Sequence, residues 1–232
     1  MSILQGLGDA LKLLFNLDPH LWGIVGRSLQ VSLLAIALAA CLAVPLGAVL
    51  GLIRENRFLK GFIVFNNALM GLPPVVAGLV VYILLSRQGP LGSWQLLFTV
   101  TAMVIVQVVL AFPIILGLSL SAVQAVPPGI REAAKTLGAS PREQVLAVMR
   151  EAKGGLLVAI AAGLGRVLAE VGAVMLVGGN IAGRTRVMTT AIVLETRQGN
   201  FGLAMGLGLI LILLSVGLNM LINALGGKGA WR

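Results

Sequence analysis

The chain has 232 residues, of which 58% are hydrophobic and only 11% are charged, whereas about a quarter of the residues in a soluble domain are charged. The apolar residues lie in long runs, and a run of about 18 or more is typical of a transmembrane helix. Cys41 and His20 are the only residues of their kinds. This excludes an intrachain disulfide, a metal centre of cysteines or histidines, and a Ser-His-Asp triad. The net charge of +9 is spread over short loops between apolar runs, a pattern typical of membrane topology signals and not of nucleic-acid binding.

The first segment, residues 1–20, is expected to form an amphipathic helix that lies on the membrane surface. Its apolar residues recur at helical spacing, with polar residues on the opposite face: Leu4, Leu7, Leu11, Leu14 and Phe15. The segment is too short and too polar to span a bilayer. A frayed tail is the alternative interpretation.

Five apolar runs follow that are long enough to cross the membrane, and together they define a transmembrane domain over residues 27–225. The expected spans are residues 28–53, 62–85, 96–125, 155–177 and 201–225. The fold class predicted from this pattern is all-α, a polytopic membrane protein with five transmembrane helices. The chain is expected to end in a short tail, residues 226–232, with no regulatory domain.

The distribution of basic residues between the loops predicts the orientation of the chain. Residues 54–61, 126–154 and 226–232 would lie on one side of the membrane and carry ten basic residues, against six on the other side. Because basic loops are retained on the cytoplasmic side, the N-terminus is expected outside the cell membrane and the C-terminus in the cytoplasm.

Prolines interrupt three of the expected spans, and the pair Pro73–Pro74 lies in the middle of the second one. A proline breaks the hydrogen-bond ladder of a helix, and within a membrane the freed groups must be satisfied by protein or by a cavity. Pro73 and Pro74 are therefore expected to break the helix, either as a simple kink or as part of a helix that lines a pathway.

The long loop 126–154 carries the strongest local signals. Pro128 suits the first position of a helix, and Gly138 is placed to end that helix as a C-cap. Ser140–Glu143 has the pattern of a capping box that begins a second helix. The first helix would be about ten residues and about 15 Å long, too short to span, with its apolar residues on one face: Ile130, Ala133, Ala134 and Leu137. Such a helix is suited to a groove on another protein.

Glu132-Ala133-Ala134, followed by Gly138, resembles the EAA motif of bacterial ABC importer permeases. The resemblance implies the type I importer fold, and it implies that Glu132, Ala133, Ala134, Leu137 and Gly138 form a coupling helix that docks on an ATP-binding subunit.

Further motifs resemble the oxyanion branch of that family, which includes molybdate, tungstate and sulfate permeases. They are residues 71–78, 89–92, 165–172 and 178–183. Residues 184–199 look most like the tungstate permeases. The resemblance therefore implies import of an oxyanion, with tungstate favoured and molybdate or sulfate as alternatives on the same fold.

Charged residues within or beside the spans are candidates for a role in transport. Arg166 and Glu170 lie four residues apart in the fourth span, so they would share a helix face and form either a structural ion pair or part of a gate. Arg184, Arg186 and Arg197 lie in an outer loop. They would contact an oxyanion, acidic residues of a binding protein, or lipid headgroups.

No phosphate-loop motif occurs in the sequence, so this chain is not expected to be an enzyme or to hold a cofactor. ATP and Mg²⁺ are expected on a partner. The expected partners are a second copy of the chain, two ATP-binding cassette subunits, a periplasmic or lipid-anchored oxyanion-binding protein, and membrane lipid. Gly47 and Gly51, like Gly202 and Gly206, have the four-residue spacing of close helix contacts and are a weak indication of the dimer face. A standalone channel or secondary transporter, or a membrane enzyme, is the alternative from another class.

Overall fold

The computed structural model describes residues 19–53 and 56–226. These residues form helices without strands, which confirms the predicted fold class. The helices are α2 (Pro19–Leu52), α3 (Arg57–Met70), α4 (Pro74–Leu85), the 3-10 helix η1 (Gly92–Trp94), α5 (Val100–Gln124), α6 (Pro128–Thr136), α7 (Pro141–Glu151), α8 (Lys153–Leu168), α9 (Gly172–Gly178), α10 (Met188–Gln198) and α11 (Phe201–Gly226). The predicted surface helix lies outside the described residues, except for Pro19 and His20, which belong to α2. The predicted tail lies outside them as well, apart from Gly226.

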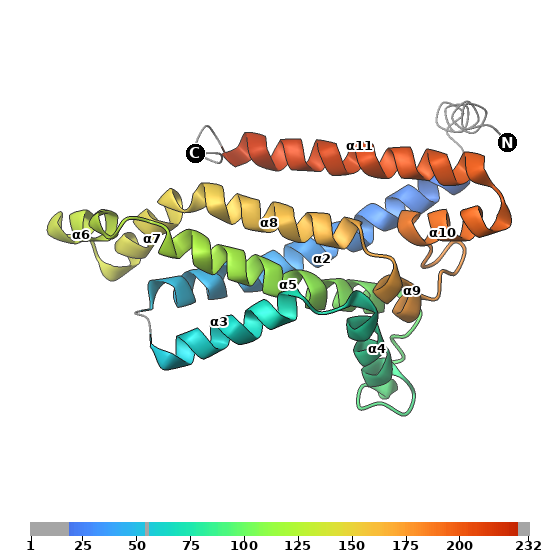
Figure 1. Cartoon of the computed structure of the whole chain (residues 1–232), viewed down its shortest axis with the longest axis horizontal. Helices are drawn as coiled ribbons and strands as arrows, with labels where there is room; N and C mark the ends of the chain where they lie inside the picture. The colour runs from blue at the N-terminus through green and yellow to red at the C-terminus, as the bar shows by residue number, and fades with distance from the viewer. Residues whose placement is uncertain (1–18, 54–55, 227–232) are drawn as a thin grey trace.

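The helices form an elongated bundle with α5 at its centre (Figure 1). Helix α5 packs most extensively against α2 and also contacts α3, α4, α8 and α9, while α11 lies against α8 and α10. Helix α6 projects at one end of the bundle, here called the α6 end, and α9 and α10 lie at the opposite end, here called the α10 end (Figure 1).

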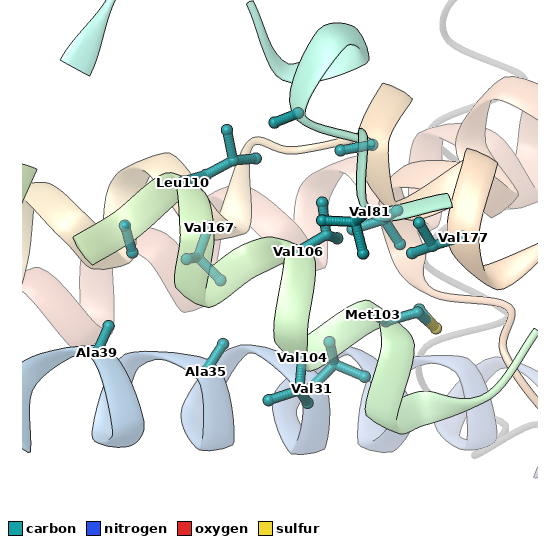
Figure 2. Packing of buried hydrophobic residues seen from close by; sticks show 14 of the residues in the cluster. Val31, Ala35, Ala39, Val81, Met103, Val104, Val106, Leu110, Val167 and Val177 are labelled. Carbon is teal, nitrogen blue, oxygen red and sulfur yellow. The ribbon is translucent and has the colours of Figure 1, made fainter. Parts of the chain in front are cut away.

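Small residues allow α2 to approach α5 closely. Figure 2 shows Ala35 and Ala39 of α2 along this contact, with Val31 beside Val104 of α5. Further along α2, a Cβ atom on Gly47 would lie only 2.8 Å from the backbone oxygen of Leu116. Without bulky side chains the backbones come together, which is how membrane helices gain packing energy that the hydrophobic effect does not supply there.

The same contact corrects the interpretation of Gly47 and Gly51 as part of a dimer face. A Cβ atom on Gly51 would lie 2.9 Å from Cβ of Val123, so both glycines pack against α5 of their own chain. Four-residue spacing identifies a close contact, but it does not identify the partner helix.

Within residues 19–53 and 56–226, three helices are long and apolar enough to cross a membrane alone, namely α2, α5 and α11. The other two predicted spans are each divided between two helices: α3 and α4 meet at 97°, and α8 and α9 at 61°. If each bent pair counts as one span, the total is the predicted five. Helix α2 begins nine residues before the predicted first span.

The break between α3 and α4 is the one predicted from Pro73 and Pro74. Helix α3 ends at Met70, and α4 begins with Pro74 at its first position, where the missing N–H costs no hydrogen bond. The carbonyl of Pro73 accepts the amides of Val76 (3.0 Å) and Ala77 (3.1 Å). The chain therefore turns sharply and restores its backbone hydrogen bonds within one turn.

The close contact between α2 and α5 predicts that Gly47→Val destabilises the protein. The added side chain would overlap the backbone and Ser119 of α5, and overpacking of this kind costs about 2 kcal/mol. Thermal unfolding in detergent should show a melting temperature lower by roughly 5 °C. Gly217→Val is the control, because a Cβ atom on Gly217 meets nothing within 4 Å. An equal loss of stability in both variants would contradict this account of the contact.

Candidate functional site

Helix α6 has the caps that the sequence predicts. Gly138 has a φ of +79°, and its amide donates to the carbonyl of Lys135 (3.1 Å), while the amide of Ala139 donates to the carbonyl of Ala134 (3.0 Å). This pair of bonds is a Schellman motif, which requires a left-handed residue and therefore favours glycine. The prediction that Gly138 ends the helix is confirmed.

The capping box of α7 is also confirmed. The carboxylate of Glu143 accepts the backbone amide of Ser140 (2.7 Å), and the Ser140 hydroxyl accepts the amide of Glu143 (3.4 Å). Hydrogen bonds from the Ser140 side chain and backbone lower the pKa of Glu143 below its ordinary value, because they stabilise the ionised carboxylate. Because the C-terminus of α6 and the N-terminus of α7 are both capped, the turn between the two helices is held in one conformation.

Helix α6 buries none of its side chains. Leu137, just beyond its last turn, is 87% exposed, and Glu132 and Ala133 are exposed as well, while Ile130 and Ala134 are partly covered. An exposed leucine beside alanines, at the tip of the bundle (Figure 1), offers a small apolar surface that its own chain does not use. This is the geometry expected of a helix that binds a groove on a partner.

Arg166 and Glu170 do not form an ion pair, which was one of the two predicted alternatives. Helix α8 ends at Leu168, so the two residues do not lie on successive turns of one helix. The Glu170 carboxylate instead accepts the amide of Ala173 at the start of α9 (2.8 Å), and its backbone carbonyl accepts the hydroxyl of Thr189 (2.8 Å). Glu170 is thus a buried residue that joins α8, α9 and α10.

Around Glu170 lies a polar cluster within the apolar bundle. Its other members come from α2, α5 and α10 and line a cavity of about 10 Å³: Ser28, Ser32, Gln107 and Thr189. The side-chain amide of Gln107 donates to the carbonyl of Val167 (3.4 Å), but its buried oxygen has no hydrogen-bond partner. A space of this size is at the lower limit for one water molecule.

Gln107 and Glu195 are among the buried polar residues that sequence reasoning missed. Gln107 lies in the apolar first half of α5, whereas the other amide side chain of that helix, Gln124, is its last residue; this position was the available signal. Glu195 is buried and accepts the side-chain amide of Asn200 (2.9 Å). The residues that follow it, Thr196, Arg197 and Gln198, are polar, so the local pattern suggested a surface position.

The motif segments at the two helix breaks pack against one another. A Cβ atom on Gly78 of α4 would lie 2.7 Å from Cα of Ala173 in α9, and one on Gly172 would lie 2.9 Å from a methyl group of Val75. These glycines therefore allow α4 and α9 to touch along their backbones at the α10 end.

The three predicted loop arginines differ in their surroundings. Arg184 and Arg197 are exposed. Arg186 is partly buried, and it lines a cavity with residues of α2. The described residues contain no group of three or more His, Cys, Asp or Glu side chains arranged to hold a metal ion.

Comparison with known proteins agrees with this architecture. A family model described as the binding-protein-dependent transport system inner membrane component matches residues 43–227. The chain is 42% identical over 223 residues to the tungstate uptake system permease protein TupB of Peptoclostridium acidaminophilum, with 96% of this chain and 97% of that protein covered. It is 43% identical over 217 residues to a probable anion ABC transporter permease protein of Haloferax volcanii, with 90% of each covered.

A solved structure shares the fold. The chain superimposes on a chain of a bacterial alginate ABC transporter, crystallised in complex with an alginate pentasaccharide-bound periplasmic protein, with a TM-score of 0.76 and 17% identity. The match covers 99% of this chain and 88% of that one. The fold and the family match together define the transmembrane subunit of a transport system, not an enzyme. The chain belongs to the family of inner membrane components of binding-protein-dependent transport systems, and it is a multi-pass membrane protein.

The caps of α7 predict a measurable effect of Ser140→Ala. Loss of an N-cap costs about 1 kcal/mol, which is roughly a fivefold change in the equilibrium for opening of the first turn. Hydrogen exchange should show protection of the first amides of α7 falling by about that factor, with α5 unchanged.

The same cap predicts a dependence on pH. Because the pKa of Glu143 is lowered in the folded protein, the stabilisation is present above the pKa of the unfolded state and is lost as the pH falls through the folded value. Protection of α7 should therefore decrease in acid in the wild type and change less in Ser140→Ala. Equal acid sensitivity in both would contradict this assignment.

Proposed function

We propose that this chain is the transmembrane subunit of an ATP-driven importer of tetrahedral oxyanions, with tungstate as its substrate. The observation that carries the proposal is the similarity, over nearly the whole chain, to a tungstate uptake permease. The motif segments that resembled the oxyanion branch lie at both helix breaks and at the α10 end. In our proposal molybdate and sulfate are the alternative substrates.

ATP hydrolysis by a partner subunit would drive transport through the contact of that subunit with α6. The exposed surface formed by Ala133 and Leu137, with Glu132, Ala134 and Gly138 around it, would dock in a groove of an ATP-binding subunit. That subunit would hold ATP and Mg²⁺. The fixed turn between α6 and α7 supports this role, because a rigid connection transmits a displacement to α8, which follows α7 directly.

We further propose that two copies of the chain enclose the pathway, with two ATP-binding subunits at the α6 ends and a binding protein at the α10 ends. The α6 end would be cytoplasmic. Helix α2 begins at the α10 end, and α11 runs from α10 back toward the α6 end (Figure 1). This direction agrees with an N-terminus outside and a C-terminus inside, as the basic loops predict.

The charged residues would act at two levels of the pathway. Arg184 and Arg197, which are exposed at the α10 end, would contact the binding protein or the incoming anion, and Arg186 would contact the anion. Glu170 links α8, α9 and α10 through its hydrogen bonds, so it would hold these helices in register as the gate opens, with Arg166 partly exposed nearby in sequence.

Uptake into cells tests the proposal. A strain that lacks this permease should accumulate less tungsten from nanomolar tungstate, measured by mass spectrometry of washed cells, and the wild-type gene should restore uptake. Leu137→Asp should fail to restore it although the protein is present in the membrane, because a buried charge would oppose docking of the ATP-binding subunit. Leu137→Met keeps the apolar volume and is the matched control.

The competing ions separate the alternatives. For a tungstate permease, a hundredfold excess of sulfate should leave tungsten uptake nearly unchanged. Loss of molybdenum or sulfate uptake, with tungsten uptake intact in the deletion strain, would contradict tungstate as the substrate. Full uptake by Leu137→Asp would contradict energisation through α6 and would favour a standalone channel.

A further inference from the structure

A cavity of about 180 Å³ lies at the α10 end, between the first turns of α2 and the turn that precedes α10. One wall is a single face of α2, formed by residues at helical spacing, and the other is a short loop. The lining residues are Pro19, His20, Gly23, Ile24, Arg27, Gly183 and Arg186. The volume is on the order of ten times the minimum that holds one water molecule, so the cavity has room for a small polyatomic ligand.

Hydrogen bonds fix the loop that forms the second wall. The carbonyl of Ile181 accepts the amide of Arg186 (3.0 Å). The hydroxyl of Thr185, which is buried, donates to the carbonyl of Gly178 (2.6 Å) and accepts the amide of Ile181 (3.0 Å). The backbone beside Arg186 is therefore held in one conformation.

A further hydrogen bond fixes the loop against α2. The amide of Met188 donates to the hydroxyl of Ser28 (2.6 Å), and both residues are buried. Since Ser28 follows Arg27 and Met188 lies two residues after Arg186, this bond sets the positions of the two arginines relative to each other. The cavity is a built feature of the fold and not a chance gap between mobile side chains.

The charges that the described residues place around the cavity are unbalanced. Two guanidinium groups line it, and the described residues of its wall include no carboxylate. Arg27 donates to the side-chain oxygen of Gln30 (2.8 Å), which is neutral. The Nε atom of Arg186 is buried and has no hydrogen-bond partner. A buried unpaired donor on a cation is costly, and a bound anion would remove both the unpaired donor and the repulsion between the arginines.

We propose that this cavity binds a tetrahedral oxyanion group through Arg27 and Arg186. Two guanidinium forks match the several acceptor oxygens of such a group and suit it better than a halide or a planar carboxylate. The same chemistry is offered by a free dianion such as tungstate and by the phosphate of a lipid headgroup. The choice of a free oxyanion as one candidate rests on the proposed function, whereas the site itself rests on the cavity and its charges.

A substitution of Gly23 would fill the site without changing its charge. Gly23 lines the cavity, and a Cβ atom there meets nothing within 4 Å, so the side chain of Gly23→Leu would extend into the cavity. Gly26 lies one turn further along α2, also has open space at its Cβ position, and does not line the cavity. Gly26→Leu is therefore a matched control for the effect of a leucine on α2.

The experiment measures equilibrium binding to the purified full-length permease, without a binding protein. In nanodiscs of a phosphate-free glycolipid, the probe is tungstate, and the bound metal is counted by mass spectrometry after dialysis. In discs that contain phosphatidylglycerol, the probe is that lipid, counted by native mass spectrometry. The variants are Arg27→Gln, Arg186→Gln and Gly23→Leu, and the controls are Gly26→Leu and Arg87→Gln, an exposed arginine of another loop.

The expected result is saturable binding that each of the three cavity variants weakens at least tenfold. Each arginine variant loses a charge-assisted hydrogen bond, and the leucine of Gly23→Leu fills the space of the ligand. Both controls should bind as the wild type does. Tungstate binding with this pattern assigns the site to a free oxyanion, and lipid retention with this pattern assigns it to a headgroup phosphate. Binding of neither probe, or binding that the cavity variants leave unchanged, overturns the proposal.

Uptake of tungstate by the same variants separates this inference from the proposed function. If the wild type transports tungstate but neither probe depends on the cavity, the site fails and the function stands. If the cavity binds an oxyanion group but the chain transports no tungstate, the function fails and the site stands.

Discussion

The structure depends on one constraint, which is that backbone N–H and C=O groups inside a membrane must be satisfied by the protein itself. This chain breaks two of its membrane helices, at Gly71–Pro73 and at Ala169–Val171. Each break persists because nearby groups take over the lost hydrogen bonds: the carbonyl of Pro73 at the first, and the carboxylate of Glu170 at the second. The breaks allow the short helices α4 and α9 to turn toward each other, and their glycines let them touch.

The two ends of the bundle consequently have different chemistry. At the α6 end, a short capped helix buries nothing and leaves Leu137 exposed, so this surface would be available to the proposed partner. In the interior, Glu170 and Gln107 line a small polar cavity, and at the α10 end Arg186 lines a cavity beside α2. A subunit that receives mechanical work at one end and handles an anion at the other would require such a division. This division agrees with the family of the chain, the inner membrane components of binding-protein-dependent transport systems.

Sequence reasoning predicted the features that depend on local chemistry. Pro128, Gly138 and the capping box at Ser140 determine α6 and α7 within a few residues, and Pro73 determines the first break. The features that it missed depend on tertiary contacts. No proline marks the second break, so the fourth span was expected to be one helix, with Arg166 and Glu170 on the same face. The partner of Gly47 and Gly51 was equally invisible, because spacing along one helix carries no information about which helix packs against it. The grouping of Arg27 with Arg186 joins residues 159 positions apart, and no local pattern contains it.

Site-specific photo-crosslinking tests most directly the claim that a partner drives this chain through α6. A photoreactive amino acid would replace Ala133 in α6 and, as a control, Trp94 in η1 at the opposite end, which is 63% exposed. In membranes that retain ATP-dependent uptake, the probe at position 133 should form an adduct with the ATP-binding subunit, and the probe at position 94 should form none with it. An active transporter without an adduct at position 133, or with equal adducts at both positions, would contradict the account.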